Sequence, residues 1–109
     1  MSEITHTLKM DLEKEGLLMF IKPWQLDCMK TLWNSSDGLS SRMVWDPIKD
    51  EISRASVINF LEEMTLNGLL VKHEITGKGG HRGIYKPTND ESGTRRYLKR
   101  IFKQRLDQL

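Results

Sequence analysis

The sequence predicts a small, mainly α-helical domain that carries one two-stranded β-hairpin. Apolar residues recur at helical spacing in several segments of the 109-residue chain. Residues 53–67 form a capped amphipathic segment that ends at a glycine and leads directly into a short apolar strand. A basic loop with three glycines, residues 76–82, then separates this strand from a returning one.

Length and composition indicate one globular domain, residues 1–109, with 38% hydrophobic and 29% charged residues. The longest apolar run, residues 17–21, is far shorter than a membrane span. No charged start followed by an apolar stretch indicates a signal peptide, so a cytoplasmic protein is expected. The single cysteine, Cys28, excludes an internal disulfide and a multi-cysteine metal site, and we expect it to be a small buried hydrophobe.

Charge is distributed unevenly along the chain. Residues 1–69 hold seven Lys and Arg against eleven Asp and Glu, whereas residues 70–109 hold ten against four. This polarity suits a polyanionic partner on one face of the protein. A solvated basic C-terminal helix without any partner is the alternative interpretation.

The N-terminal segment predicts a helix over residues 3–15. Ile4, Leu8 and Leu12 follow one another at spacings of four, which places them on one side of a helix. Gly16 is expected to end this helix.

Two further helices are predicted before the amphipathic segment. One covers residues 24–34 and opens at Pro23, a residue preferred in the first helical position. Ser40 or Ser41 is expected to cap the next helix. Pro47 predicts a kink or an early end within it.

The third core helix is capped by Ser53, and Gly68 is expected to take the left-handed conformation just past its end. Strands are predicted over residues 69–74 and 83–87, and a last helix over residues 92–109. Three helices followed by a hairpin form a winged helix-turn-helix, here with an extra helix at each end of the core.

Three segments resemble the penicillinase and methicillin-resistance repressor family and its copper-responsive relatives: residues 23–33 (PWQLDCMKTLW), the pair Val44-Trp45 and residues 53–70 (SRASVINFLEEMTLNGLL). The first helix of that family typically ends in Met-x-x-Leu-Trp, as residues 29–33 do. Its third helix carries a Leu-x-x-x-Gly-Leu/Phe pattern, which residues 64–69 approach. The resemblance covers about residues 22–87.

This resemblance implies a homodimeric transcriptional regulator whose third helix enters the major groove of a two-fold symmetric operator. The C-terminal helical region dimerises in that family. Here this role is expected of Leu98, Ile101, Phe102 and Leu106, the apolar stripe of the last helix. Packing of the two terminal helices within one chain is the alternative. The expected partners are double-stranded DNA and a second copy of the chain.

The outward face of the third helix supplies the candidate base-reading residues: Ser53, Arg54, Ala55, Ser56 and Asn59. Asn59 can form two hydrogen bonds with adenine, and Arg54 can bind guanine or a phosphate. Ala55 can contact a thymine methyl group, and the free N–H groups near Ser53 can bind a phosphate.

The hairpin supplies the candidate phosphate-binding residues: Lys72, Lys78, His81, Arg82 and Lys86. Cations that neutralise phosphates release condensed counterions, which makes binding strongly salt-dependent. An ordinary hairpin tip without a ligand is the alternative.

Glu62 and Glu63 depart from the basic or neutral residues that the family often has in the third helix. They motivate the main alternative function, a winged-helix protein-interaction module with little affinity for DNA. The three histidines are scattered, and no metal-ligand or catalytic spacing occurs. We therefore expect no enzyme activity, no metal site and no cofactor.

Overall fold

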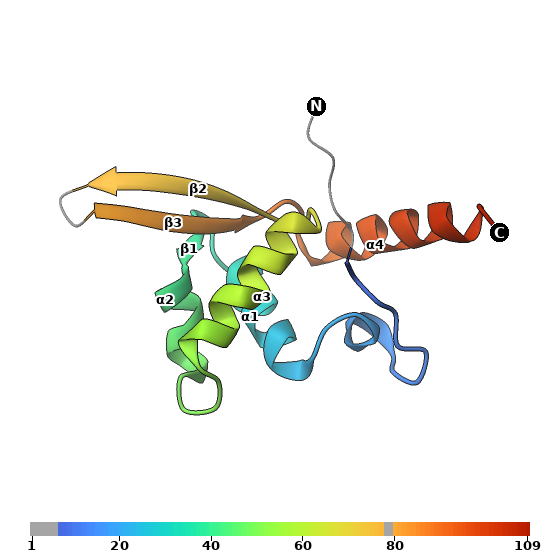
Figure 1. Cartoon of the computed structure of the whole chain (residues 1–109), viewed down its shortest axis with the longest axis horizontal. Helices are drawn as coiled ribbons and strands as arrows, with labels where there is room; N and C mark the ends of the chain where they lie inside the picture. Colours follow the sequence, from blue (N-terminus) through green and yellow to red (C-terminus); the bar gives the residue numbers. More distant parts are fainter. Residues whose placement is uncertain (1–6, 78–79) are drawn as a thin grey trace.

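The computed structural model of the protein describes residues 7–77 and 80–109. In chain order its elements are the 3₁₀ helix η1 (Gly16–Met19), α1 (Pro23–Trp33), β1 (Leu39–Ser40), α2 (Ser41–Trp45), the 3₁₀ helix η2 (Asp46–Ile48), α3 (Arg54–Leu66), β2 (Leu70–Gly77), β3 (Gly80–Pro87) and α4 (Glu91–Leu106). Helices α1 to α3 form the centre of the molecule, the β2–β3 hairpin projects from one side, and α4 extends in the other direction (Figure 1).

The local signals at the helix ends are confirmed. Pro23 is the first residue of α1, and Ser40 and Ser53 each accept a hydrogen bond from a first-turn backbone N–H of α2 and α3. Gly68 has φ of +82°, the left-handed conformation that ends α3. Helix α2 ends at Trp45, two residues ahead of Pro47, and the chain continues as the 3₁₀ turn η2.

The predicted N-terminal helix over residues 3–15 is wrong for its described part, since residues 7–15 form an irregular segment with one turn. Residues 1–6 lie outside the described residues. The backbone N–H of Thr7 donates to Oδ1 of Asn67 at 2.6 Å, and that of Asp11 donates to the Met19 carbonyl at 2.7 Å. A helix this short is marginal on its own, so these tertiary hydrogen bonds determine the backbone conformation.

The sheet differs from the predicted two-stranded hairpin in two respects. Strands β2 and β3 continue into the glycine-rich segment predicted as a loop, where Gly77 pairs with Gly80. The two-residue strand β1 adds to β3, giving the order β1-β3-β2. A strand of two residues has no alternation to detect, and glycines accept an extended backbone as readily as a loop.

The hydrophobic core lies between α1, α3 and the base of the hairpin. Its fully buried side chains include those of Met29, Leu32, Val57, Leu61 and Met64. Tyr85 of β3 and Leu98 of α4 complete the same cluster, so the sheet and α4 are anchored on the three-helix centre. Among the described residues, no helix combines the length and apolar character that a membrane crossing requires.

Cys28 is buried in this core, as predicted, and we expect it to be unreactive. Burial, with a smaller contribution from the charge of Asp27, raises the pKa of the Cys28 thiol to about 12. Because the thiolate is the nucleophile, native protein should react with iodoacetamide at least about a hundredfold more slowly than urea-unfolded protein at about pH 8. Equal labelling rates for the two states would contradict this burial.

Candidate nucleic-acid interface

The first turns of α2 and α3 meet strand β3 around an open polar cleft of about 570 Å³. Three arginines from three different elements line it: Arg42 of α2, Arg54 of α3 and Arg82 of β3. The other lining residues are Ser40, Ser41, Met43, Asp46 and Gly83. The fold therefore brings together three guanidinium groups that lie far apart in the sequence.

The cleft has an excess of positive charge. Within residues 7–77 and 80–109, none of the three arginine side chains forms an ion pair. The one carboxylate of the lining, Asp46, lies 3.6 Å from the ammonium group of Lys49. The N-terminus of α3 adds the partial positive charge of its free N–H groups. This arrangement favours an anionic ligand such as a phosphate.

All five candidate base-reading residues are exposed at the beginning of α3. Arg54 is the member of this set that lines the cleft. Ser53 Oγ accepts a hydrogen bond from the backbone N–H of Ser56 at 3.2 Å and lies 2.9 Å from Ser56 Oγ. The two hydroxyl groups thus stabilise the helix end, while Ala55 and Asn59 present their side chains to solvent.

Glu62 belongs to a contact between α3 and the hairpin. The hydroxyl of Tyr85 donates to Oε2 of Glu62, and Nζ of Lys72 lies 3.3 Å from the same oxygen. The Lys72 ammonium also lies 5.5 Å from the centre of the Tyr85 ring. Burial, and then the hydrogen bond and charge of Glu62, raise the pKa of Tyr85, which keeps its hydroxyl protonated as the donor.

The phosphate-binding role of Lys72 stays a prediction, and in the structure its ammonium group forms an ion pair with Glu62 while the side chain is 30% exposed. This ion pair also gives a partner to one of the two carboxylates of α3. Glu62 is neutralised by Lys72, and Oε1 of Glu63 accepts a hydrogen bond from the hydroxyl of Thr7 at 3.4 Å. Both carboxylates that depart from the family pattern therefore have partners in the protein itself.

Duplex DNA can serve as the polyanion that tests this ion pair: replacing Lys72 with glutamine should change the salt dependence of any binding to it very little. Each cation that contacts a phosphate contributes about 0.9 to the slope of log affinity against log salt. We expect a decrease of about 0.9 for Arg82→Gln and of less than about 0.3 for Lys72→Gln, measured by fluorescence anisotropy. Equal decreases would show that Lys72 leaves Glu62 to bind DNA.

The remaining hairpin candidates are only partly described. Lys78 lies outside the described residues, and so does the side chain of His81. The register pairs Ile75 with Arg82 and Val71 with Lys86, so both basic residues lie on the hairpin face opposite Lys72. Arg82 and Lys86 are exposed there, and Arg82 reaches the cleft.

Arg42 is the residue that the sequence reasoning missed. It follows the Ser40 cap in the first turn of α2. The first helix of a helix-turn-helix pair crosses the nucleic-acid backbone, so its exposed cations are candidate phosphate contacts. A basic residue in the first turn after a predicted helix cap could have identified Arg42 as a candidate phosphate contact.

The residues predicted to form a dimer interface are used largely within the chain. Leu98 is buried in the core of its own chain, which removes it from a contact with another copy. Ile101 and Phe102 pack against the same core, and the Phe102 ring lies 5.0 Å from that of Phe20. Leu106, which is 56% exposed, is the most accessible of the four.

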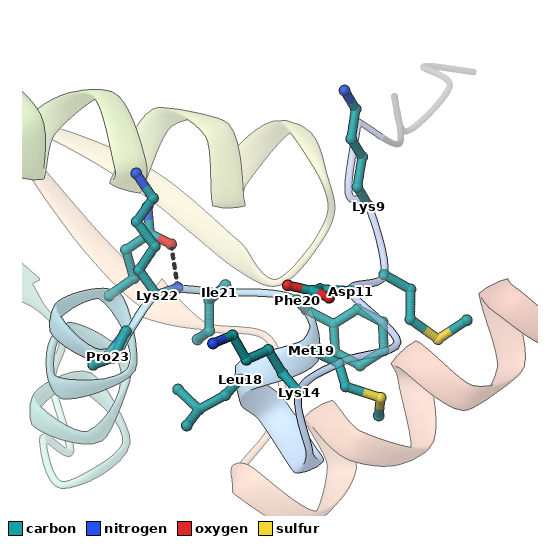
Figure 2. A pocket seen from close by; sticks show the side chains of 11 residues that line it. Lys9, Asp11, Lys14, Leu18, Met19, Phe20, Ile21, Lys22 and Pro23 are labelled. Atoms are coloured by element: carbon teal, nitrogen blue, oxygen red, sulfur yellow. Dashed lines mark hydrogen bonds between the residues drawn. The ribbon is translucent and has the colours of Figure 1, made fainter.

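A second open pocket, of about 400 Å³, lies beside η1 and the start of α1 (Figure 2). Its lining is mainly apolar. The hydrogen bond drawn in Figure 2 joins the backbone N–H of Lys22 to Oε1 of Gln25 at 2.8 Å and serves the start of α1. In the part of the chain that the structure describes, no three His, Cys, Asp or Glu side chains gather as metal ligands.

Three helices, a small antiparallel sheet and a projecting hairpin define the winged-helix fold. The solved structure of the Vibrio cholerae ferric uptake regulator (Fur) shares it, with a TM-score of 0.50 and 16% sequence identity. The match covers 65% of this chain and 55% of that one, so this chain spans about half the length of that structure. Comparison with protein-family models and with curated protein sequences finds no match.

Proposed function

We propose that this protein is a sequence-specific regulator of transcription that binds double-stranded DNA as a homodimer in the cytoplasm. The observation that carries the proposal is the cleft where Arg42, Arg54 and Arg82 converge beside the N-terminus of α3. Three guanidinium groups that form no ion pair with any described residue, at such a helix end, suit a phosphate backbone next to a groove. The protein acts in this proposal by binding and not as an enzyme.

In the proposed complex, the first two turns of α3 enter the major groove. Asn59 and Arg54 face base edges there, with adenine and guanine as their preferred partners. Arg42 and Arg82 hold the phosphates on either side and determine orientation without reading sequence. The carboxylates of Glu62 and Glu63 lie further along α3 and are already bonded within the chain.

The structural neighbour supports the general class. The Vibrio cholerae ferric uptake regulator is described as having DNA-binding domains, and its likeness to this chain concerns the fold. The finer assignment, to the penicillinase and methicillin-resistance repressor family with its two-fold symmetric operator, rests on residues 23–33 and 53–70. It remains part of the proposal.

The alternative was a protein-interaction module that uses the acidic residues of α3. The ion pair of Glu62 with Lys72 weakens the basis for that alternative, whereas Glu63 is exposed on α3 and accepts a hydrogen bond of 3.4 Å from the Thr7 hydroxyl. Affinity for DNA at moderate salt distinguishes the two functions, because an interaction module has none.

Selection of binding sites from a random duplex pool at near-physiological salt tests the proposed function. We expect enrichment of a two-fold symmetric motif. Arg54→Ala and Asn59→Ala should each flatten the motif at particular positions, whereas Arg82→Ala should weaken binding to all sequences about equally. Lys30→Ala, an exposed change on α1, is the control. Failure to enrich any sequence would reject the base-reading role of α3.

A further inference from the structure

Strand β2 leaves one edge of the sheet without a partner strand. In the order β1-β3-β2, strand β3 lies between the other two, and no described residue pairs with the far side of β2. Figure 1 shows β2 as the outermost strand of the projecting hairpin. An unpaired edge of eight residues is a template for another strand.

The side chains along this edge alternate in character. Val71 and Ile75 lie on one face of the hairpin and are 40% and 52% exposed. Lys72 and Glu74 lie on the other face, which packs towards α3 through Tyr85. Glu74 is exposed and forms no ion pair with any described residue.

The order of these residues selects one symmetric pairing of β2 with itself. When two copies pair antiparallel about a two-fold axis, one residue faces itself and its neighbours face each other reciprocally. An axis at Lys72 sets two lysines against each other, and an axis at Glu74 sets two glutamates against each other. Only an axis at His73 places Lys72 opposite Glu74 twice and Val71 opposite Ile75 twice. Opposite charges and paired β-branched residues are favourable cross-strand neighbours.

We propose that β2 docks on β2 of a second copy of this chain, in the register centred on His73. The two sheets then form one continuous sheet, and Glu74, which forms no ion pair with any described residue of its own chain, comes opposite Lys72 of the other copy. That ammonium group then lies between Glu74 and the Glu62 that it already pairs with. This deepens the proposed function, because it supplies a surface for the homodimer. The apolar stripe of α4 is a weaker candidate surface, since most of it packs on its own chain.

Disulfide trapping tests this register directly. In the proposed pairing, residue 73 faces its own copy with Cα atoms about 4.5 to 5.5 Å apart, a separation that a disulfide can bridge. Residue 75 lies about 13 Å from its own copy, which is too far. The native Cys28 is buried and does not interfere.

With oxidised glutathione as the oxidant, His73→Cys should form a disulfide-linked dimer in at least about tenfold higher yield than Ile75→Cys. The two residues are exposed on the same strand, so chance collisions affect both variants alike. Equal yields, or no dimer from His73→Cys, would overturn the register.

Sedimentation without DNA tests the contact in the absence of new cysteines. Glu74→Lys places lysines opposite one another, and we expect the dimer dissociation constant to rise about tenfold. Glu51→Lys makes the same charge change on an exposed loop and should leave the constant unchanged. A monomeric wild-type protein at roughly 10–200 µM, or equal behaviour of the two variants, would reject the contact. Binding of each variant to a single half-site is measured separately, so failure of the dimer and failure of DNA binding remain distinct results.

Discussion

Replacing Arg42, Arg54 and Arg82 together with glutamine is expected to lower the affinity for duplex DNA on the order of a thousandfold. The three guanidinium groups line one cleft and are free of ion pairs within the described chain. Each charge-assisted contact with a phosphate is roughly twice as strong as a neutral hydrogen bond. The slope of log affinity against log salt should decrease by about 1.8, for the two phosphate contacts proposed for Arg42 and Arg82.

The matched control removes three exposed cations from α4, with Arg96, Lys99 and Arg105 changed to glutamine. The net charge changes by the same amount, but the cleft is untouched. Fluorescence anisotropy titrations at several salt concentrations give both quantities for both variants. An equal loss in the control would mean that α4, and not the cleft, forms the principal contact with DNA.

Asn67→Ala is expected to lower the free energy of unfolding by about 2–4 kcal/mol. The residue is 0% exposed, and its side chain connects two segments. Oδ1 accepts a hydrogen bond from the Thr7 backbone N–H, while Nδ2 donates to the Thr7 hydroxyl at 3.0 Å and to the Glu63 carbonyl at 2.9 Å. Truncation leaves these groups without their partner and opens a cavity.

Urea and thermal unfolding followed by circular dichroism measure this effect, with an expected fall in melting temperature of about 10–20 °C. Thr65→Ala is the control, because Thr65 Oγ1 donates to the Leu61 carbonyl of its own helix at 2.8 Å and to no other described residue. That change should cost less than about 1 kcal/mol. Similar losses for Asn67→Ala and Thr65→Ala would show that the link to Thr7 contributes nothing to stability.

The winged-helix core was predictable because its signals are local. Pro23 at the start of α1, the Ser53 cap and Gly68 in the left-handed conformation each act within one turn of chain. The apolar stripe of α3 likewise follows from helical spacing alone. These features depend on no distant residue, and the structure confirms them.

The features that the sequence did not reveal depend on contacts across the fold. Strand β1 exists because β3 pairs with it, and the segment after Thr7 is held by Asn67, sixty residues further along the chain. The candidate site also depends on contacts between residues that are distant in the sequence. The sequence alone does not predict the proximity of Arg42 to Arg82 or the pairing of Lys72 with Glu62, because both depend on how the elements pack.

The contact of Glu62 with Lys72 and Tyr85 has a consequence for recognition. It links α3, the helix proposed to enter the groove, to the hairpin proposed to contact the phosphates. The orientation of the helix relative to the hairpin is therefore fixed before DNA binds. Preorganisation of this kind reduces the entropy lost on binding. In the proposed complex, we therefore expect a site whose groove width differs from the spacing of α3 and the hairpin to be bent on binding. Sequences that deform easily are then favoured even at positions that no side chain touches.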